Sequence, residues 1–449
     1  MSEIAVIGAG LVGCLAAIGF AKEGYKVALY EGRPDLRLPE EQAKSSLRSI
    51  NLAVSARGIL ALKSVDREMA DRVLSDLIPM SGRMIHGLDG SQKSQNYGLY
   101  GESINSINRA LLNRSLLDEL DKVGVQTFFD YKLVRADLRG NVRPSLLFRT
   151  AEGEEIRKEV DVVIGADGSF STVRNQIQRV VQMNFSQQYI DHYYLELKIG
   201  AGPNNTFALD PNHLHIWPRH EFMLIALANG DKTFTSTLFA PRAIFDKLDQ
   251  SWDKFKDFFG DQFPDAVKLI GLESLKNSFE NNPRGSLVSV KCSPYNAGGK
   301  AILIGDSAHS MVPFYGQGMN CGFEDVRTLL ECLDATKFDF EKGFDLYSKT
   351  RHKDLLSIVD LSMRNYIEMR HSVTSSLYLL RKSVDGLLSR TLGDAWLPLY
   401  TMVSFRPDIP YSRAIEQEER QKKIINYGLI SLGAITVVGS ILFKRVLRS

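Results

Sequence analysis

Apolar and polar positions predict a β-α-β unit at the start of the chain. An apolar run, Ile4–Ile7, precedes a helix-compatible stretch from Leu11 to about Glu23, and a second apolar run follows at Lys26–Tyr30. Short apolar runs on either side of a helix are typical of buried parallel strands. The glycine at position 24 marks the end of the helix.

The same buried strand type returns twice, and an antiparallel pattern lies between the two occurrences. Residues 160–168 read VDVVIGADG and residues 301–306 read AILIGD. Between them, 193–239 contains four segments of alternating polarity, which is typical of an antiparallel sheet in a separate domain. The pattern therefore predicts a discontinuous parallel-sheet domain that carries an inserted antiparallel domain.

Helices are predicted near Ala56–Val65 and at Asn108–Val123, where leucines recur at a spacing that places them on one face. From Asp325 to about Gln421 the pattern is mostly helical.

Glycines after the first strand indicate dinucleotide binding. Gly8, Gly10 and Gly13 form a GxGxxG between strand and helix. In this context the glycines serve a tight turn, the close approach of a pyrophosphate, and helix packing. Glu31 ends the second strand at roughly the ~20-residue offset where an acid binds a ribose hydroxyl. An acid there repels a 2′-phosphate, so we expect FAD or NAD rather than NADP as the tightly held nucleotide.

Composition and charge exclude other classes. The chain has 449 residues, 44% of them hydrophobic, and 55 basic against 53 acidic residues give a formal charge of +2. This is a globular protein without the basic excess of a nucleic-acid binder. Its four cysteines have no CxxC or metal-ligand spacing, so we expect reduced thiols and no metal site.

The segment Ile424–Phe443 is predicted to be a transmembrane tail anchor. It has twenty residues without a charge and is flanked by basic residues on both sides. That length crosses the ~30 Å hydrocarbon layer as a helix. A buried core helix is the alternative, although core helices are usually shorter. No leader fits ahead of Ile4, so we expect a catalytic body facing the cytosol, anchored at the mitochondrial outer membrane.

Three glycine-acid elements resemble those of the class A flavoprotein aromatic monooxygenases. They are the fingerprint with Glu31, Gly165–Gly168 as a DG motif, and Gly305-Asp306 as a GD motif. The resemblance implies bound FAD, NADPH as a transient co-substrate, and O2 captured as a flavin C4a-hydroperoxide. A second GxGxxG after a strand does not occur in the sequence, in keeping with transient NADPH. Asp306 would hold the ribityl chain, and the turn 316–320 would aim N–H groups at the flavin.

Within the class, the chain resembles the kynurenine 3-monooxygenase family over nearly its whole length. The stretches that carry this resemblance are SINLAVSARG (49–58), IPMSGRMIHGLDG (78–90), HLHIWPRHEFMLIALAN (213–229), MVPFYGQGMNCGFED (311–325), DLSMRNYIEMR (360–370) and LPLYTMVSF (397–405). The resemblance implies hydroxylation of L-kynurenine to 3-hydroxykynurenine, in tryptophan degradation and pyridine nucleotide biosynthesis.

The resemblance also implies the site residues. Arg83 and Tyr97 would bind the substrate carboxylate, assisted by Asn365 and Tyr400, and a planar guanidinium suits that role. Pro313 and Phe314 would line the ring-binding side, although packing in the core is an equal alternative for both. No residue is expected to act as a catalytic acid or base, because the flavin performs the chemistry.

The residues expected to bind the cofactor are Gly8, Gly10, Leu11, Val12, Gly13, Tyr30, Glu31, Arg33, Ala53, Arg109, Leu133, Asp167, Thr172, Asp306, Gln317, Gly318, Met319 and Asn320.

The predicted fold class is α/β. We expect a Rossmann-type FAD-binding domain of the p-hydroxybenzoate hydroxylase type, an inserted antiparallel-sheet substrate domain, a C-terminal helical region and the transmembrane helix. The predicted boundaries are 1–78, 101–178 and 285–335 for the first domain, 79–100 and 179–284 for the second, 336–421 for the third, and 424–443 for the anchor.

Two other functions remain open from the sequence. One is a class A hydroxylase or epoxidase with another aromatic or lipid substrate. The other is a non-enzymatic flavoprotein whose redox state controls an interaction. Flavin reduction by NADPH that accelerates only with kynurenine would separate the three.

Overall fold

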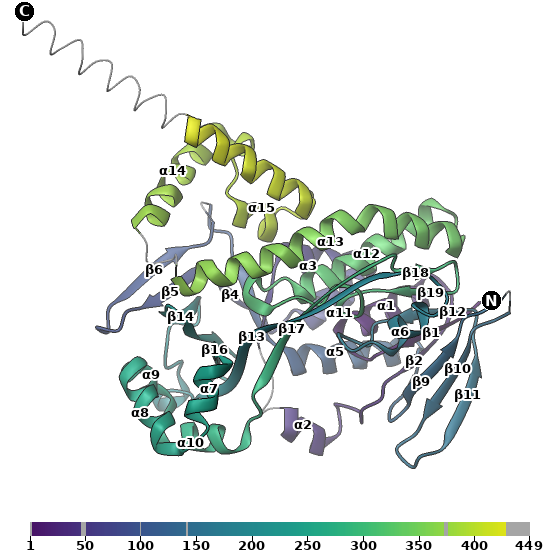
Figure 1. The fold of residues 1–449 in the computed structure, drawn as a ribbon, viewed down its shortest axis with the longest axis horizontal. Helices are drawn as coiled ribbons and strands as arrows, with labels where there is room; N and C mark the ends of the chain where they lie inside the picture. The colour runs from purple at the N-terminus through teal and green to yellow at the C-terminus, as the bar shows by residue number, and fades with distance from the viewer. Residues whose placement is uncertain (1, 46–50, 99, 141, 372–375, 428–449) are drawn as a thin grey trace, which may run out of the picture.

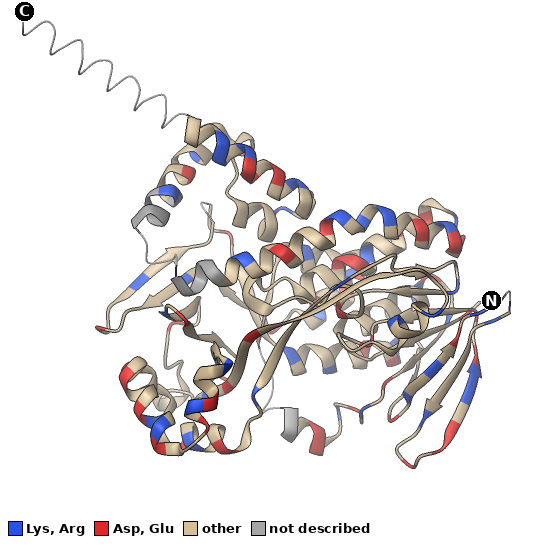
Figure 2. Cartoon of the chain, in the orientation of Figure 1, with Lys and Arg blue, Asp and Glu red and all other residues tan. Residues whose placement is uncertain are grey.

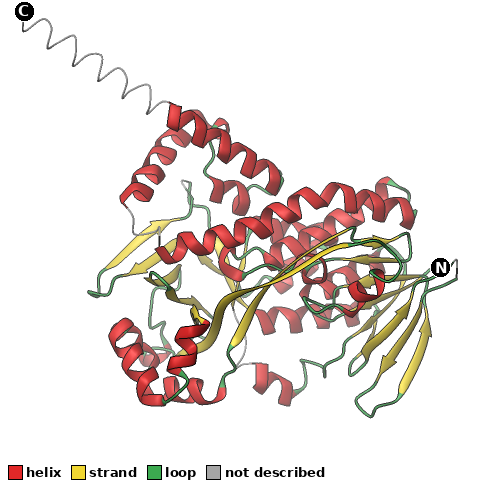
Figure 3. Cartoon of the chain, in the orientation of Figure 1, coloured by secondary structure: helices red, strands yellow, loops and turns green. Residues whose placement is uncertain are grey.

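Two large sheets organise the fold, as a computed structural model shows for residues 2–45, 51–98, 100–140, 142–371 and 376–427, the part of the chain that the structure describes (Figure 1). Helices pack beside both sheets, and a further group of helices follows at the C-terminal end (Figure 3). Basic and acidic positions are interspersed along the long helix α13 (Phe340–His371) and along the outer strands β9 (Lys132–Asp137), β10 (Ser145–Arg149) and β11 (Glu155–Glu159) (Figure 2).

The first sheet contains the predicted β-α-β unit. Its strand order is β18 (Asn296–Ala297), β19 (Ala301–Leu303), β12 (Val162–Gly165), β1 (Glu3–Ile7), β2 (Lys26–Tyr30) and β8 (Gln126–Phe128). All neighbouring pairs are parallel except β18 with β19. The strands predicted from the apolar runs are therefore confirmed, and they join three distant parts of the chain in one sheet.

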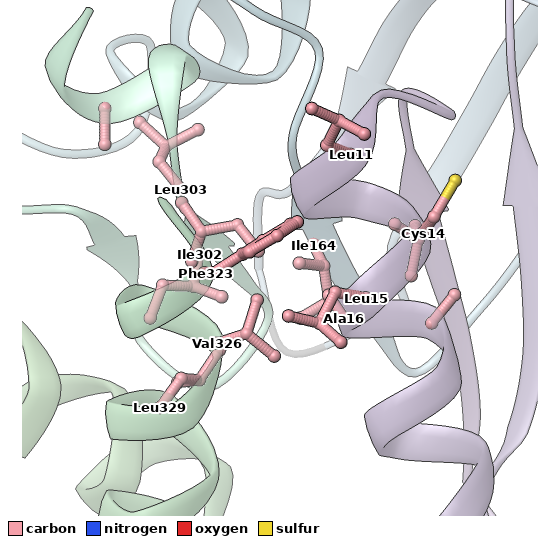
Figure 4. Packing of buried hydrophobic residues seen from close by; sticks show 14 of the residues in the cluster. Leu11, Cys14, Leu15, Ala16, Ile164, Ile302, Leu303, Phe323, Val326 and Leu329 are labelled. Carbon is pink, nitrogen blue, oxygen red and sulfur yellow. The ribbon is translucent and has the colours of Figure 1, made fainter. Parts of the chain in front are cut away.

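Helices α1 (Leu11–Lys22), α5 (Arg109–Lys122) and α12 (Gly318–Ala335) form one core with this sheet. Figure 4 shows Leu11 and Leu15 of α1 near Ile164 and Ile302 of the sheet, with Phe323 of α12 between them. Nine residues of α1 are buried, on all of its sides. Such complete burial fits a helix enclosed between the sheet and other helices, and it fixes the N-terminal end of α1 relative to the strands.

The second sheet corresponds to the predicted antiparallel insertion, except that β5 pairs with β14 in parallel. Its strand order is β17 (Gly285–Ser293), β13 (Asn184–Ile199), β16 (Phe234–Pro241), β15 (Phe222–Ala228), β14 (His213–Arg219), β5 (Gly82–His86) and β6 (Gln92–Asn96). Strand β13 begins nine residues before the predicted segment, because its first half is mostly exposed and lacks an apolar face. The predicted boundary at 284/285 falls where β17 begins.

Four helices follow β16, and their buried apolar side chains share a core with the second sheet. They are α7 (Arg242–Leu248), α8 (Trp252–Gln262), α9 (Pro264–Ile270) and α10 (Leu272–Asn281).

The smaller elements connect these layers. One small sheet has the order β11 (Glu155–Glu159), β10 (Ser145–Arg149) and β9 (Lys132–Asp137), and another has β3 (Asn51–Val54), β7 (Ile104–Asn108) and β4 (Ile78–Met80). The short helices are α2 (Pro39–Ser45), α3 (Ala56–Val65), α4 (Arg67–Val73), α6 (Thr172–Ile177) and α11 (Asp306–His309), with 3₁₀ turns η1 (Pro203–Asn205) and η2 (Pro313–Tyr315).

The predicted C-terminal helical region is present. It contains α13, α14 (Ser376–Leu392), the turn η4 (Gly393–Ala395), α15 (Leu399–Phe405) and a helix over 411–427.

The transmembrane helix in the predicted fold class has to be corrected. Among the described residues, none of the helices is both long and apolar enough to cross a bilayer. The described start of the predicted anchor, residues 424–427, continues a helix that carries charges at Glu418, Glu419 and Lys422. The rest of that prediction, 428–443, lies outside the described residues.

Candidate functional site

The glycine fingerprint forms a tight turn between β1 and α1. Gly8 has a φ of +104°, a conformation that L side chains rarely adopt, and an added Cβ would lie 2.4 Å from the carbonyl oxygen of Ala166. An added Cβ at Gly13 would lie 1.9 Å from the carbonyl oxygen of Gly8. At Gly10 an added Cβ would meet no described protein atom within 4 Å. Gly8 and Gly13 thus allow close backbone packing, whereas Gly10 faces open space.

That open space is a cavity of about 590 Å³ at the carboxyl ends of the parallel strands. Gly8 and Gly10 follow β1, Glu31 follows β2, Asp167 follows β12, and Asp306 follows β19, and all of them line it. Ligands of open α/β sheets bind at this edge. The further predicted cofactor residues that line it are Leu11, Val12, Tyr30, Arg33, Ala53, Arg109, Leu133, Thr172, Gly318 and Met319.

Glu31 is fixed at the end of β2 by hydrogen bonds. Its carboxylate accepts from the backbone N–H of Ala9 at 2.9 Å, and from the N–H and Nε of Arg33 at 3.0 and 2.9 Å. Burial alone would raise the pKa of the Glu31 carboxyl, but Arg33 and these N–H groups hold that pKa below its usual value. The cavity therefore keeps an ionised acid at this strand end.

Asp167 is held by hydrogen bonds to the first residues of α6 and to Ser171 before them. Its carboxylate accepts from the Ser171 hydroxyl at 2.5 Å and from the backbone N–H groups of Thr172 and Val173 at 2.7 and 3.1 Å. Burial raises the pKa of the Asp167 carboxyl despite these donors. Asp167 thus secures the start of α6, while Asp306, at the start of α11, is exposed to the cavity.

Three predicted cofactor residues pack into the protein with their side chains or backbone. Gly13 lies against Gly8. The Asn320 amide donates to the carbonyls of Ala53 and Gly316 at 2.8 and 2.7 Å and accepts from the Ser55 N–H at 2.9 Å. The Gln317 side chain accepts from the Tyr411 hydroxyl at 3.1 Å. Their cofactor roles remain predictions, and the geometry assigns the Gln317 and Asn320 side chains to shaping the turn at 316–320.

A second cavity, of about 820 Å³, collects the residues predicted to bind a substrate carboxylate. Arg83 of β5, Tyr97 after β6, Asn365 of α13 and Tyr400 of α15 all line it. Charged residues of α14 and of the helix over 411–427 also line it, among them Arg390 and Lys422. Four segments far apart in the sequence therefore meet at one cavity.

Arg83 lies beside a stacked pair of aromatic rings. Its guanidinium carbon is 5.4 Å from the ring centre of Tyr97 and 5.2 Å from that of Tyr400, and the two rings stack at 4.9 Å. Arg83 is only 6% exposed. Burial raises the pKa of both phenols, so they stay protonated and can donate hydrogen bonds. A buried guanidinium beside two phenol donors can bind a carboxylate.

The turn η2 separates the two cavities. Pro313 lines the first cavity and Tyr315 lines the second. Phe314 between them is buried, with its ring stacked on Tyr366 at 4.0 Å, and its carbonyl accepts from the Asn365 amide at 2.7 Å. Pro313 is therefore placed on the cofactor side, and Phe314 packs in the core.

Sequence reasoning missed several residues that line the first cavity. They are Asn51, Leu52, Tyr131, Lys132, Ser169, Phe170 and Met311, among others. Most of them lie in turns or on short strands of mixed polarity, where the only available signal is nearness to a motif residue. Phe170, for example, follows the DG motif by two positions and is 67% exposed.

Comparisons with known proteins agree with this geometry. The family described as FAD binding domain matches residues 1–361. Kynurenine 3-monooxygenase of Yarrowia lipolytica is 57% identical over 450 residues, which cover 97% of both chains, and that of Saccharomyces cerevisiae is 50% identical over 461 residues, covering 100% of this chain and 99% of the other. Among solved structures, 2-methyl-3-hydroxypyridine-5-carboxylic acid oxygenase aligns with a TM-score of 0.67 at 20% identity, over 91% of this chain and 97% of that one.

Proposed function

This chain belongs to the FAD-dependent kynurenine 3-monooxygenase family, and we propose on that premise that it hydroxylates L-kynurenine to 3-hydroxykynurenine with NADPH and O2. The observation that carries the proposal is the meeting of Arg83, Tyr97, Asn365 and Tyr400 at one cavity, with a single turn between that cavity and the dinucleotide cavity.

The first cavity fits FAD. Gly10 leaves room for the diphosphate, because a Cβ there would meet no described protein atom within 4 Å, and Glu31 offers an ionised acid for a ribose hydroxyl. The GD motif lies at the same cavity as the fingerprint, so one elongated dinucleotide can reach both. Bound FAD would accept reducing equivalents from NADPH and activate O2 for oxygen transfer to the ring.

The protein's own residues bind and orient the substrate. Arg83 and the phenols of Tyr97 and Tyr400 hold the amino-acid carboxylate, which places the aniline ring toward η2 and the cofactor. Orientation of this kind lowers the entropy cost of reaching the reactive geometry. Burial of Arg83 and Tyr97 also excludes water from the carboxylate.

Anaerobic stopped-flow reduction by NADPH tests the proposal. FAD-loaded protein is mixed with NADPH, with and without L-kynurenine, and flavin absorbance is followed. Acceleration by L-kynurenine, with 3-hydroxykynurenine formed in air, is the expected result. Equal reduction rates and no hydroxylated product would contradict the substrate, and would favour a class A hydroxylase of another aromatic or lipid compound.

Localisation at the mitochondrial outer membrane stays a prediction from the sequence. It depended on the C-terminal span, for which the described residues offer no support.

A further inference from the structure

The helix that carries Tyr400 is unusually dependent on partners outside itself. Helix α15 spans only seven residues, Leu399–Phe405. The last four carbonyls of any α-helix have no intrahelical partner. In a helix of seven residues, these four are more than half of all the backbone carbonyls. The carbonyls of Met402 and Val403 belong to this set, so something must donate hydrogen bonds to them.

One buried guanidinium supplies those donors. Arg57 of α3 is 1% exposed, and its Nε donates to the carbonyl of Val403 at 2.7 Å. Its Nη2 donates to the carbonyls of Met402 and Arg406 at 3.2 Å each, and also to that of Ile409. A cation at a helix C-terminus also interacts favourably with the helix dipole. Arg57 therefore terminates α15 from outside the helix.

The remaining nitrogen of the Arg57 guanidinium, Nη1, binds helix α12, whose first residues line the cofactor cavity. Nη1 donates to Glu324 of α12 at 2.9 Å, and Glu324 also accepts from Arg351 at 3.0 Å. The guanidinium carbon lies 4.1 Å from the ring centre of Tyr411, whose hydroxyl donates to Gln317 at 3.1 Å. Gln317 immediately precedes α12. The segment after Tyr400 is thus tied to α12 through one side chain.

We propose that Arg57 is a positioning residue for substrate binding, acting through Tyr400. It fixes α15 against α3 and α12, so that the Tyr400 ring stays stacked on Tyr97 and over Arg83. This inference rests on the proposed function, because it assigns Arg57 a share in the affinity for the substrate carboxylate. Lysine cannot replace it, since a single ammonium cannot donate along the several directions that the planar fork serves at once.

Calorimetric titration of FAD-loaded Arg57→Lys with two ligands tests the proposal without turnover. L-Kynurenine carries the carboxylate, and its decarboxylated amine does not. The expected result is a Kd for L-kynurenine raised roughly tenfold, a size typical of coupling within one hydrogen-bond network, with the Kd of the amine unchanged. The inference would be overturned if the affinity for both ligands fell equally, or if neither affinity changed.

Arg219→Lys is the matched control. Arg219 also donates to several carbonyls, those of Gln262, His86 and Pro218, and lies over an aromatic ring, that of Phe263. It ends β14, whose Leu214 pairs with Arg83 at the other end. We expect Arg219→Lys to leave both Kd values unchanged. Loss of L-kynurenine affinity in this control equal to that in Arg57→Lys would mean that any arginine bonded to several carbonyls has this effect.

The route through Tyr400 is tested by a double variant. In a Tyr400→Phe background, Arg57→Lys is expected to cause a smaller further loss of L-kynurenine affinity than in wild type, because the hydroxyl is already gone and only the ring is left to be positioned. Additive losses would show that Arg57 acts elsewhere.

A milder variant decides the case if Arg57→Lys does not retain FAD. Glu324→Gln keeps Arg57 but removes one of its countercharges, and the same selective loss for L-kynurenine is expected. An unchanged ratio of the two Kd values in that variant would overturn the inference. Wild-type protein that binds no L-kynurenine would instead contradict the proposed function, before any variant is compared.

Discussion

The cofactor cavity takes its walls from strand ends of one sheet, whereas the Arg83 cavity takes its walls from side chains of separate elements. Gly8, Glu31, Asp167 and Asp306 each follow a strand of the parallel sheet within a few residues. Arg83, Asn365 and Tyr400 come from a strand of the other sheet and from two helices. The first cavity therefore depends on backbone geometry that short motifs encode. The second depends on long-range packing.

Substitution in the fingerprint should have the largest effect, because no side chain can move to relieve it. Gly13→Ala would place a Cβ 1.9 Å from the Gly8 carbonyl. We expect FAD to be lost and the free energy of unfolding to fall by about 3 kcal/mol, the upper part of the usual cost of overpacking. Flavin absorbance after gel filtration and thermal unfolding of the apoprotein measure the two effects.

Gly10→Ala sharpens the same comparison. A Cβ at Gly10 meets no described protein atom within 4 Å. Apoprotein stability should stay near wild type while FAD retention falls, because the methyl group occupies cavity space. If Gly13→Ala retained FAD like wild type, the backbone account of this cavity would be wrong.

Substitution at the second cavity should spare the first. Arg83→Met removes the charge but keeps an apolar stem of similar length. We expect L-kynurenine binding to weaken by roughly 2 to 5 kcal/mol, as for a buried charge-assisted pair, with FAD content unchanged. Arg364→Met is the control, because Arg364 lines the same cavity but is exposed, and an effect within about 0.5 kcal/mol is expected. Wild-type affinity in Arg83→Met would remove Arg83 from the substrate site.

Acidification should act on the sheet behind Arg83. His215 is 1% exposed, and its Nδ1 lies 2.8 Å from Nε2 of His86. Burial lowers the pKa of His215 to about 4, although a hydrogen bond to the Asp210 carbonyl acts in the opposite direction. The unfolded chain, with a histidine pKa near 6.5, binds a proton at pH 5 that the folded state rejects, so stability falls as the pH drops from about 6.5 to 4.

The size of this effect is about 2 kcal/mol at pH 5. His215→Gln cannot titrate, so its free energy of unfolding should change less than that of wild type between pH 7 and pH 5. Urea unfolding followed by tryptophan fluorescence at both pH values measures the difference. Parallel pH profiles for the two proteins would contradict a lowered pKa at His215.

The contrast between the cavities also explains how far the sequence could predict the structure. The strands and helices around the fingerprint were predicted within one to three residues, because tight turns and buried runs leave local signals. The first half of β13 was missed, since it is stabilised by pairing with β17 and not by an apolar face.

The site residues divide in the same way, into those with a local sequence signal and those without one. Glu31 was found from its spacing alone, whereas Tyr97 and Tyr400 were named only through a family resemblance, because nothing local separates them from ordinary packing tyrosines. The inward turn of the Gln317 and Asn320 side chains could not be predicted, since their partners lie on other elements.

The chain order of the two cavities has a consequence for biosynthesis. Residues that line the cofactor cavity end at Met319, whereas those of the Arg83 cavity extend from Arg83 to Lys422. Because the N-terminal part of a chain leaves the ribosome first, every residue that lines the dinucleotide cavity is synthesised before the last residues of the Arg83 cavity. The nascent chain therefore contains the full set of cofactor-lining residues before it contains the full set that would recognise an aromatic amino acid.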